Sequence, residues 1–181
     1  MSHALRMIRN QVDQHRTERG KQMKGVAVVG FVLVVILHLA SGLSFAERAE
    51  DCQTLVTKAI DFVKDKGSNY AFRVFSASKG PFIDKELYVF ACSLDNIMLA
   101  HPYQRDLIGQ NVDEFKDAKG HLLFQEFRKV AEVGGQGWVY YWWPKPGENG
   151  TFPKASFIMK VPGEKLYVGA GYYKTDGGER H

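Results

Sequence analysis

The stretch GWVYYWWPKPGENGTFPKASFIMKVPGEKLYVGAGYY, residues 137–173, decides the fold. It contains three runs of aromatic and β-branched residues, which are the side chains that β-strands favour. The turn sequences PKPGENG and PG separate the runs. Because short turns join neighbouring strands that run in opposite directions, the stretch predicts an antiparallel meander. The predicted strands cover residues 137–143, 154–161 and 165–173.

Two helices and a β-hairpin are predicted upstream of this stretch. Apolar residues recur at the helical spacing over residues 47–66 and again over residues 122–133, and glycines end both segments. Between them, the β-rich runs 86–93 and 97–101 are separated only by Leu-Asp-Asn, so we expect them to pair as a hairpin. The pattern over residues 70–75 fits a short helix or a turn.

This order of elements predicts a single α+β domain over residues 47–181. The order is a helix, two strands, a helix-bearing insert and three strands. It indicates a five-stranded antiparallel sheet with its helices on one face or at one end. The sequence contains no internal repeat and no low-complexity linker that would divide the domain.

The positive charge of the chain lies in its first residues. The whole chain has a formal net charge of +4. Residues 1–46 contain six Lys or Arg and two Asp or Glu, and residues 47–181 contain 18 of each sign. The predicted domain therefore lacks the excess of Lys and Arg on which nucleic-acid binding depends, and no nucleic-acid partner is expected.

Residues 1–46 have the features of an export signal. Two lysines precede an apolar run over residues 26–39, and the small residues Ser44 and Ala46 follow at the spacing that signal peptidase requires. We expect cleavage after Ala46 and a periplasmic or secreted domain. Alternatively, the same apolar segment stays uncleaved as an inner-membrane anchor. The leader is long for a signal peptide, so Met23 is an alternative start.

The two cysteines, Cys52 and Cys92, permit one disulfide. An even number of cysteines in an exported chain is compatible with a bridge. The alternative is a pair of buried free thiols that pack as small apolar side chains.

Three polar side chains are candidates for holding an anionic ligand. His101 ends the predicted hairpin, and Pro102 favours an extended backbone before it, so the imidazole can face a pocket. The alternative is a rim histidine that is hydrogen-bonded to its own turn. Lys154 begins a strand and Arg105 lies in the insert loop. Each can pair with a carboxylate, or each can be a solvated surface charge.

The aromatic residues of the strand at 137–143 alternate between two faces. Trp138, Tyr140 and Trp142 share one face by the period of two, and Tyr88 and Phe90 share a face of the first hairpin strand. Two aromatic faces exceed what a one-sided core uses, so one face is predicted to line a ligand pocket. The alternative is an apolar core on both faces beneath helices.

The insert contains a predicted turn, KDAKG, at residues 116–120. The Asp117 side chain can accept hydrogen bonds from backbone amides, and Gly120 supplies a positive φ. We expect Gly109 to have a similar conformation. We interpret these residues as shaping the insert loop.

The segments LYVF, LDNIMLAHP, LIGQN, KDAKG, GGQGWVYYWWPKPG, PKASFI and YVGAGYY, in this order, resemble the single Cache domain of the sCache type-2 group. The resemblance covers residues 54–174. It implies an extracytoplasmic, PAS-like sensor with a long N-terminal helix against a five-stranded antiparallel sheet. It also implies a pocket beneath the insert for small organic molecules, frequently short carboxylates. Family members commonly continue into a membrane helix and a chemoreceptor or histidine-kinase module. This chain stops at His181, from which we expect a free-standing periplasmic binder.

The motifs of common enzyme classes are absent from the sequence. It contains no H-E-x-x-H, no G-x-S-x-G and no glycine-rich phosphate loop after a strand. We therefore expect a non-catalytic module without a cofactor that binds a small organic acid and has a membrane receptor or kinase as partner. In this reading Lys154 and His101 hold the negative end of the acid. The alternatives are an interaction protein that docks on a membrane sensor and a membrane-anchored sensor.

Overall fold

The structure is a computed structural model that describes residues 46–174. The predicted leader, with its apolar run, lies outside the described residues, and so the predicted cleavage stays a prediction. The elements are a helix over residues 46–66, α2 (Ser68–Phe75), β1 (Ile83–Asp84), β2 (Leu87–Ser93), β3 (Met98–Ala100), the 3-10 turn η1 (Arg105–Leu107), α3 (Leu123–Val133), β4 (Gln136–Pro144), β5 (Thr151–Lys160) and β6 (Leu166–Tyr173). No helix within these residues combines the length and the apolar character needed to span a membrane.

The strands form one antiparallel sheet in the order β1-β2-β6-β5-β4, and β3 also pairs with β2. The predicted α+β fold, the meander of β4, β5 and β6 and the hairpin of β2 and β3 are confirmed. The last strand lies in the middle of the sheet, where Val89 of β2 is opposite Ala170 of β6. The sheet has one strand more than predicted, because β1 has only two residues and leaves no periodic pattern in the sequence.

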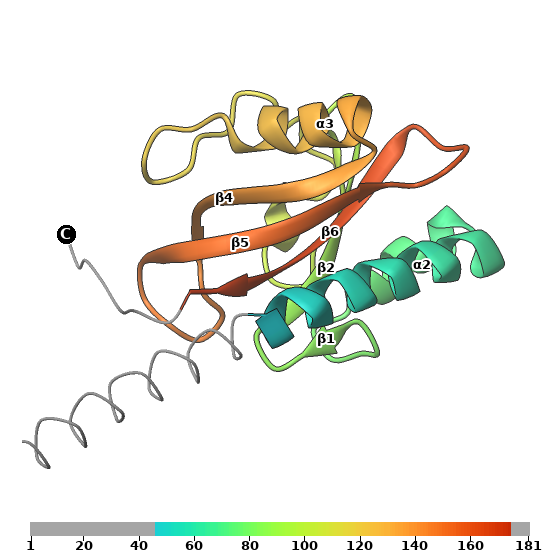
Figure 1. Cartoon of the computed structure of the whole chain (residues 1–181), viewed down its shortest axis with the longest axis horizontal. Helices are drawn as coiled ribbons and strands as arrows, with labels where there is room; N and C mark the ends of the chain where they lie inside the picture. The colour runs from blue at the N-terminus through green and yellow to red at the C-terminus, as the bar shows by residue number, and fades with distance from the viewer. Residues whose placement is uncertain (1–45, 175–181) are drawn as a thin grey trace, which may run out of the picture. The chain divides into compact units, whose positions relative to one another are not determined.

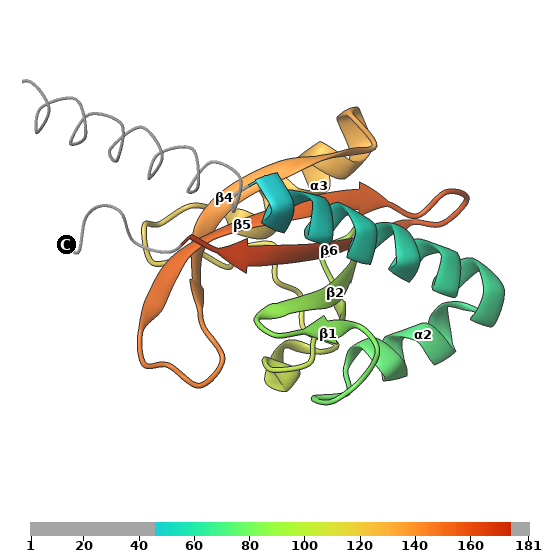
Figure 2. The same cartoon turned by 60° about the horizontal axis from the view of Figure 1, so that its bottom comes forward.

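Helices cover both faces of the sheet. Figures 1 and 2 show the helix over residues 46–66 and α2 on one face, and α3 with the insert on the other. The prediction of helices on one face is therefore wrong. The reason is that the central strand has two apolar faces, since all eight residues of β6 are buried, and water must be excluded from both of them.

Each face has its own apolar core. The helix-side core lies under the helix over residues 46–66 and contains Cys52, Val56, Val89, Phe157 and Val168 among others. The insert-side core lies under α3 and contains Tyr88, Phe90, Phe127, Tyr141, Trp143 and Ile158 among others. Since successive side chains of a strand point to opposite faces, this division decides which residues can meet at a common site.

The same division rules out a disulfide, which the sequence left open as one of two possibilities. Cys52 and Cys92 are both free and buried. Cys52 belongs to the helix-side core and Cys92 to the insert-side core, so the sheet lies between them. The thiol of Cys92 instead donates to the carbonyl oxygen of Ile97, at 3.1 Å. The alternative of two buried free thiols is the correct one.

Candidate functional site

A small cavity lies in the insert-side core, between the sheet and α3. Its volume is about 10 Å³, close to the space that one water molecule requires. Its wall is largely aromatic, and the lining residues are Tyr88, Phe90, Met98, His101, Phe124, Phe127, Tyr141 and Trp143. A cavity of this shape and polarity favours a small ligand with an apolar part.

Glycine on β6 makes room for the floor of this cavity. A Cβ atom at Gly169 would lie 2.5 Å from the ring carbon Cζ of Phe90 and 2.7 Å from Cδ1 of Ile158. Carbon atoms at non-bonded contact need about 3.5 Å. Only glycine at this position leaves room for the Phe90 ring and the Ile158 side chain as they lie.

His101 is a wall residue of the cavity and is also bonded to its own turn. The side chain is 2% exposed, and its Nδ1 accepts hydrogen bonds from the backbone N–H groups of Tyr103, at 3.1 Å, and Gln104, at 2.8 Å. A nitrogen that accepts two N–H groups carries no hydrogen, so the hydrogen of the neutral ring lies on Nε2. His101 thus lines the cavity and is hydrogen-bonded to its own turn, but it is buried and not at a solvent-facing rim. Its role as a donor to a carboxylate stays a prediction.

The imidazole of His101 is uncharged at physiological pH. Burial lowers the pKa of His101 to about 3, and the positive charge of Lys154 contributes to the shift. The side chain is therefore a neutral donor through Nε2. It cannot hold a carboxylate by charge, as a protonated histidine would.

Lys154 is a buried lysine. It is 1% exposed, on the insert-side face of β5. Its Nζ is the one buried side-chain nitrogen or oxygen in residues 46–174 that has no hydrogen-bond partner. Burial lowers its pKa well below the usual lysine value, although Cys52 and Glu86 oppose the shift. Buried polar groups almost always have partners, so this amine points to a ligand.

Aromatic rings surround the amine. Lys154 Nζ lies 3.7 Å from the ring centre of Tyr88 and 4.8 Å from that of Tyr173. The Tyr173 hydroxyl donates to the carbonyl oxygen of Pro144, at 2.6 Å, and its oxygen lies 3.4 Å from that of Tyr88. Tyr88 is shared by the cavity wall and the surroundings of Lys154, so it links the cavity to the amine.

The nearest acidic side chain has other partners. Glu86 lies just before β2, and its two carboxylate oxygens pair with Arg48, at 3.7 Å, and Lys145, at 3.5 Å. Arg48 also donates to the carbonyl oxygen of Tyr173, at 3.1 Å. The charge of Glu86 is thus neutralised near the surface, and it makes no ion pair with Lys154.

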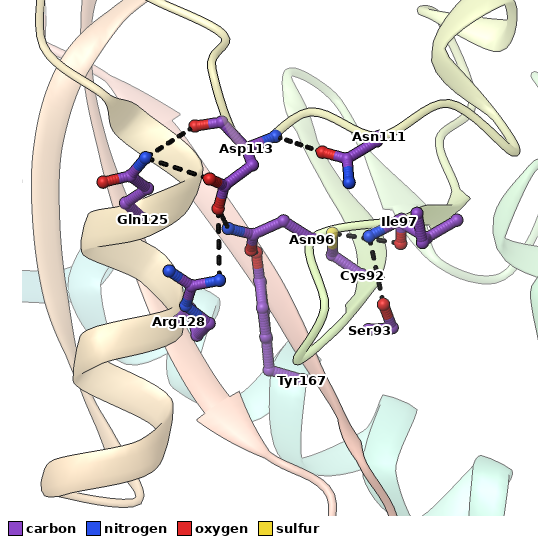
Figure 3. Close-up of polar contacts among 9 residues, drawn as sticks. All are labelled: Cys92, Ser93, Asn96, Ile97, Asn111, Asp113, Gln125, Arg128 and Tyr167. Carbon is purple, nitrogen blue, oxygen red and sulfur yellow. Dashed lines mark hydrogen bonds and ion pairs between the residues drawn. The ribbon is translucent and has the colours of Figure 1, made fainter.

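A polar cluster fastens the insert to the sheet and to α3 (Figure 3). Asn96, which is fully buried, donates to Asp113 at 2.6 Å, and the Asp113 carboxylate also binds Arg128, at 3.1 Å, and Gln125, at 3.2 Å. Tyr167 of β6 donates to the Asn96 side chain at 3.4 Å. This cluster holds the insert loop in place over the cavity.

The predicted turn at residues 116–120 is confirmed. Asp117 accepts from the backbone N–H groups of Lys119 and His121, and Gly120 has a φ of 86°. Asp117 also accepts from the N–H of Trp142 at the outer edge of β4, at 3.0 Å. Burial raises the pKa of this carboxyl, but the backbone hydrogen bonds outweigh that effect and hold the pKa below its usual value. Gly109 likewise has a positive φ, of 82°.

The structure brings together four of the eight predicted site residues. Tyr88, Phe90 and His101 line the cavity, and Lys154 lies against the Tyr88 ring. Arg105 is exposed in η1 and is not among the lining residues.

The three aromatic residues predicted from β4 do not line this cavity, and their part in ligand binding stays a prediction. Trp138 packs on Phe157 and Tyr172 of the helix-side core, Tyr140 is 57% exposed, and Trp142 lies on the same side. The alternation itself was right, but the opposite face of β4 lines the cavity. The β4 residues that line it are Tyr141 and Trp143.

Sequence reasoning missed the lining residues from three elements. They are Met98 of β3, Phe124 and Phe127 of α3, and Tyr141 and Trp143 of β4. One signal could have found Tyr141. It is directly opposite Lys154 in the β4–β5 register, so the two side chains share a face whenever these strands pair through the PKPGENG turn.

No group of three or more His, Cys, Asp or Glu side chains that could bind a metal occurs in the described part of the chain. The site therefore consists of one buried amine, one neutral imidazole donor and aromatic walls.

The chain is similar to sensor proteins of two kinds. It is 30% identical over 93 residues to the methyl-accepting chemotaxis protein McpP of Pseudomonas putida, which is 51% of this chain and 17% of McpP. It is 30% identical over 92 residues to the sensor histidine kinase MctS of Rhizobium johnstonii, which is 51% of this chain and 20% of MctS. The similarity thus spans a fifth or less of each relative's length.

Two solved structures have the same fold. A periplasmic sensor domain of a chemotaxis protein is 30% identical, with a TM-score of 0.58, over 70% of this chain and 90% of that domain. A Cache chemosensory domain, solved to explain carboxylic acid recognition, is 24% identical, with a TM-score of 0.62, over 72% of this chain and 96% of that one. A family model described as a Cache domain matches residues 78–177, which include every residue of the cavity wall and Lys154. With its fold, its insert and most of its length accounted for in this way, the chain belongs to the Cache domain family.

Proposed function

We propose that this domain is an extracytoplasmic sensor module that binds a short aliphatic carboxylate in the insert-side cavity. The observation that carries the proposal is the amine of Lys154, which is buried and has no hydrogen-bond partner within residues 46–174. An anion is the ligand that such an amine binds most strongly, because a charge-assisted hydrogen bond forms in a medium of low dielectric.

The remaining groups favour a carboxylate with a small apolar body. A carboxylate has two oxygens, so one can pair with Lys154 while the other accepts from Nε2 of His101. The aromatic walls then contact the carbon atoms of the ligand. A single cation suits a single negative charge, since a second carboxylate would be buried against these walls without a partner.

The size of the cavity favours the smallest acids. A volume of about 10 Å³ is the space of about one water molecule, so any acid must displace side chains of the wall. Acetate and propionate require the smallest displacement. The Cache chemosensory domain with a similar fold was solved with carboxylic acid recognition in view. That likeness supports the proposal.

The proposed role of the whole protein is signal reception. The curated relatives are a chemotaxis receptor and a sensor kinase, and we propose that this domain passes ligand occupancy to a membrane receptor or kinase. The predicted signal peptide, with cleavage after Ala46, and the predicted periplasmic location are part of the same proposal.

Calorimetric titration of the purified chain with sodium acetate and sodium propionate tests the function. A buried hydrogen bond to a charged group contributes about 1.5–3 kcal/mol, so we expect Lys154→Met to weaken binding by roughly ten- to a hundredfold. Lys160→Met is the matched control, because Lys160 lies on the same strand and is half-buried. It should bind as the wild type does. Equal affinities for the wild type and Lys154→Met would contradict the proposed site.

A further inference from the structure

Lys154 does not have the surroundings of a permanently charged lysine. Its Nζ is enclosed by the rings of Tyr88 and Tyr173, and no side-chain or backbone acceptor lies within hydrogen-bond distance in the described residues. An ammonium group in such a place has lost its hydration without compensation. The neutral amine loses much less, so it is the stable form before a ligand arrives.

We infer that the site takes up one proton with each carboxylate it binds, and that Lys154 holds this proton in the complex. The inference rests on the proposed function, because it concerns the same cavity and the same ligand class. The balance is simple: a neutral amine, a carboxylate and a proton from solvent become an ammonium–carboxylate pair. No bond other than the N–H bond forms, and none breaks.

His101 cannot take this proton in place of Lys154. Its Nδ1 accepts two backbone N–H groups, and protonation there would break both hydrogen bonds. Its Nε2 already carries the hydrogen of the neutral ring. The geometry of the turn after β3 therefore excludes the imidazole as the proton acceptor.

Several other titratable groups surround Lys154. They are Cys52 on the helix over residues 46–66, Glu86 and Tyr88 at β2, Tyr141 on β4, and Tyr103 and Tyr173 on the insert loop and β6. Burial raises the pKa of the Cys52 thiol to about 12 and raises the pKa values of Tyr88, Tyr141 and Tyr173 as well, so these groups stay neutral.

Glu86 is the one carboxylate in this group, and it is paired with two cations away from Lys154. It is held by Arg48 and Lys145 in ion pairs near the surface, and Lys145 Nζ also lies 5.8 Å from the centre of the Tyr173 ring. These charges are outside the cavity wall. Lys154 is left as the group whose charge changes when an anion enters.

The consequence is that the domain responds to the product of acid and proton concentrations. Above the pKa of the ligand-free Lys154, each pH unit makes protonation tenfold less favourable, so the apparent Kd for acetate should rise by up to about tenfold per unit. Below that pKa the amine is already charged and the affinity should be constant. The sensor would thus report a weak acid most strongly in an acidified environment.

Calorimetry of the full chain with sodium acetate in different buffers tests the inference. The observed heat is measured at one pH in phosphate, HEPES and Tris, whose ionisation enthalpies differ. The slope of heat against ionisation enthalpy is the number of protons taken up. We expect a slope that approaches one proton per acetate at alkaline pH, falls toward zero at acidic pH, and accompanies the loss of affinity.

Two variants test whether Lys154 is the group that takes up the proton. Lys154→Met should bind acetate weakly and without proton uptake. Lys154→Arg carries a guanidinium that stays protonated, so any acetate that it binds should give no buffer dependence. Arg105→Ala is the control, because Arg105 is exposed in η1, and it should keep the uptake of the wild type.

The outcomes separate this inference from the proposed function. Acetate binding whose heat does not depend on the buffer at any pH would overturn the inference and leave the carboxylate site standing. Undiminished uptake in Lys154→Met would also overturn it. If neither acetate nor propionate binds the folded wild-type chain at acidic or neutral pH, the proposed function fails and the inference fails with it.

Discussion

The amine of Lys154 lies 3.7 Å from the ring centre of Tyr88, at the border between the cavity wall and the sheet. The ring face offers the amine a weak attraction when it is charged. That attraction is smaller than the loss of hydration, since burial still lowers the pKa of Lys154 well below its usual value. The domain therefore keeps at its centre a residue that lowers its stability and that a ligand can satisfy.

Replacing this lysine should stabilise the ligand-free domain. An unsatisfied buried polar group destabilises a fold by about 1–3 kcal/mol, so Lys154→Met should raise the free energy of unfolding by a similar amount near neutral pH. Urea unfolding measures it, with Lys160→Met as a control that should change stability by no more than about 0.5 kcal/mol. A variant less stable than the wild type would show that the amine has a partner.

The stability of the wild type should also depend on pH through Lys154. Its pKa is lower in the folded state than in the unfolded state, where it is ~10.4, so the unfolded chain binds the additional proton between these two values. Stability must therefore rise as pH rises through this window, and it is lowest below the folded pKa. The buried cysteines and tyrosines, whose pKa values are raised, act in the opposite direction and do so in both proteins. The test is therefore the difference between the two proteins: the unfolding midpoint of the wild type relative to that of Lys154→Met should rise with pH across the alkaline range.

His101 should cause a second pH dependence, on the acid side. Burial lowers its pKa to about 3, while the unfolded value is ~6.5, so protons favour the unfolded chain as pH falls through this range. The lost stability amounts to roughly 5 kcal/mol at most. His101→Asn keeps an acceptor for the N–H groups of Tyr103 and Gln104 but does not titrate. Its stability should fall less steeply between these pH values. Parallel curves for both proteins would contradict the buried neutral imidazole.

Adjacent tryptophans on β4 provide a test of which face binds the ligand. Trp143 lines the cavity, whereas Trp142 lies on the opposite side, with Lys119 Nζ 4.8 Å from its ring. Trp143→Leu should enlarge the cavity and shift preference toward longer acids. A methylene in an apolar pocket is worth about 1–3 kcal/mol, so the ratio of butyrate to acetate affinity should rise by about tenfold or more. Trp142→Leu should leave the ratio unchanged, and a shift in that variant instead would place the ligand on the other face.

The polar cluster at Asp113 should control the stability of the insert. Asp113→Ala removes the acceptor for Asn96, Gln125 and Arg128, which leaves the fully buried Asn96 amide short of a partner. The free energy of unfolding should fall by roughly 1–3 kcal/mol. Hydrogen exchange should become faster over residues 96–133 and stay unchanged in β5 and β6. Asp106→Ala, at an exposed residue of η1, is the control, and equal exchange in both variants would contradict this role.

The strands and helices could be predicted from the sequence because their patterns are local. The alternation of β4 and the stripe of α3 were both visible, and the structure confirms both elements. Which face of β4 meets the cavity was not visible, because it depends on where α3 crosses the sheet. The choice of Trp138, Tyr140 and Trp142 in place of Tyr141 and Trp143 has this cause. For the same reason the sequence could not decide whether Cys52 and Cys92 form a disulfide, and they lie on opposite faces of the sheet.

Two polar residues of the candidate site could be predicted from the sequence, but their protonation and hydrogen-bond partners could not. His101 could be identified from the proline that follows it, and Lys154 from its place in a predicted strand. That strand begins three residues earlier than predicted, at Thr151. That the imidazole is neutral and the amine unpartnered depends on burial by residues far away in the sequence, among them Tyr88 and Tyr173. Contacts between residues that are far apart in the sequence leave no signal in the sequence next to either residue.

The position of β6 in the middle of the sheet has a consequence for the order of folding. Its register with β2 joins residues as far apart as Val89 and Ala170, and pairing at such separation is slow because a long loop must close first. On the ribosome, β2 has no central neighbour until β6 has been synthesised. β6 supplies none of the side chains that line the cavity. It does lie between β2 and β5 in the sheet, so without it the lining residues of β2 and those of β4 are not held in one sheet. The domain should therefore become able to bind its ligand only late in folding, in the step in which β6 pairs with β2 and β5.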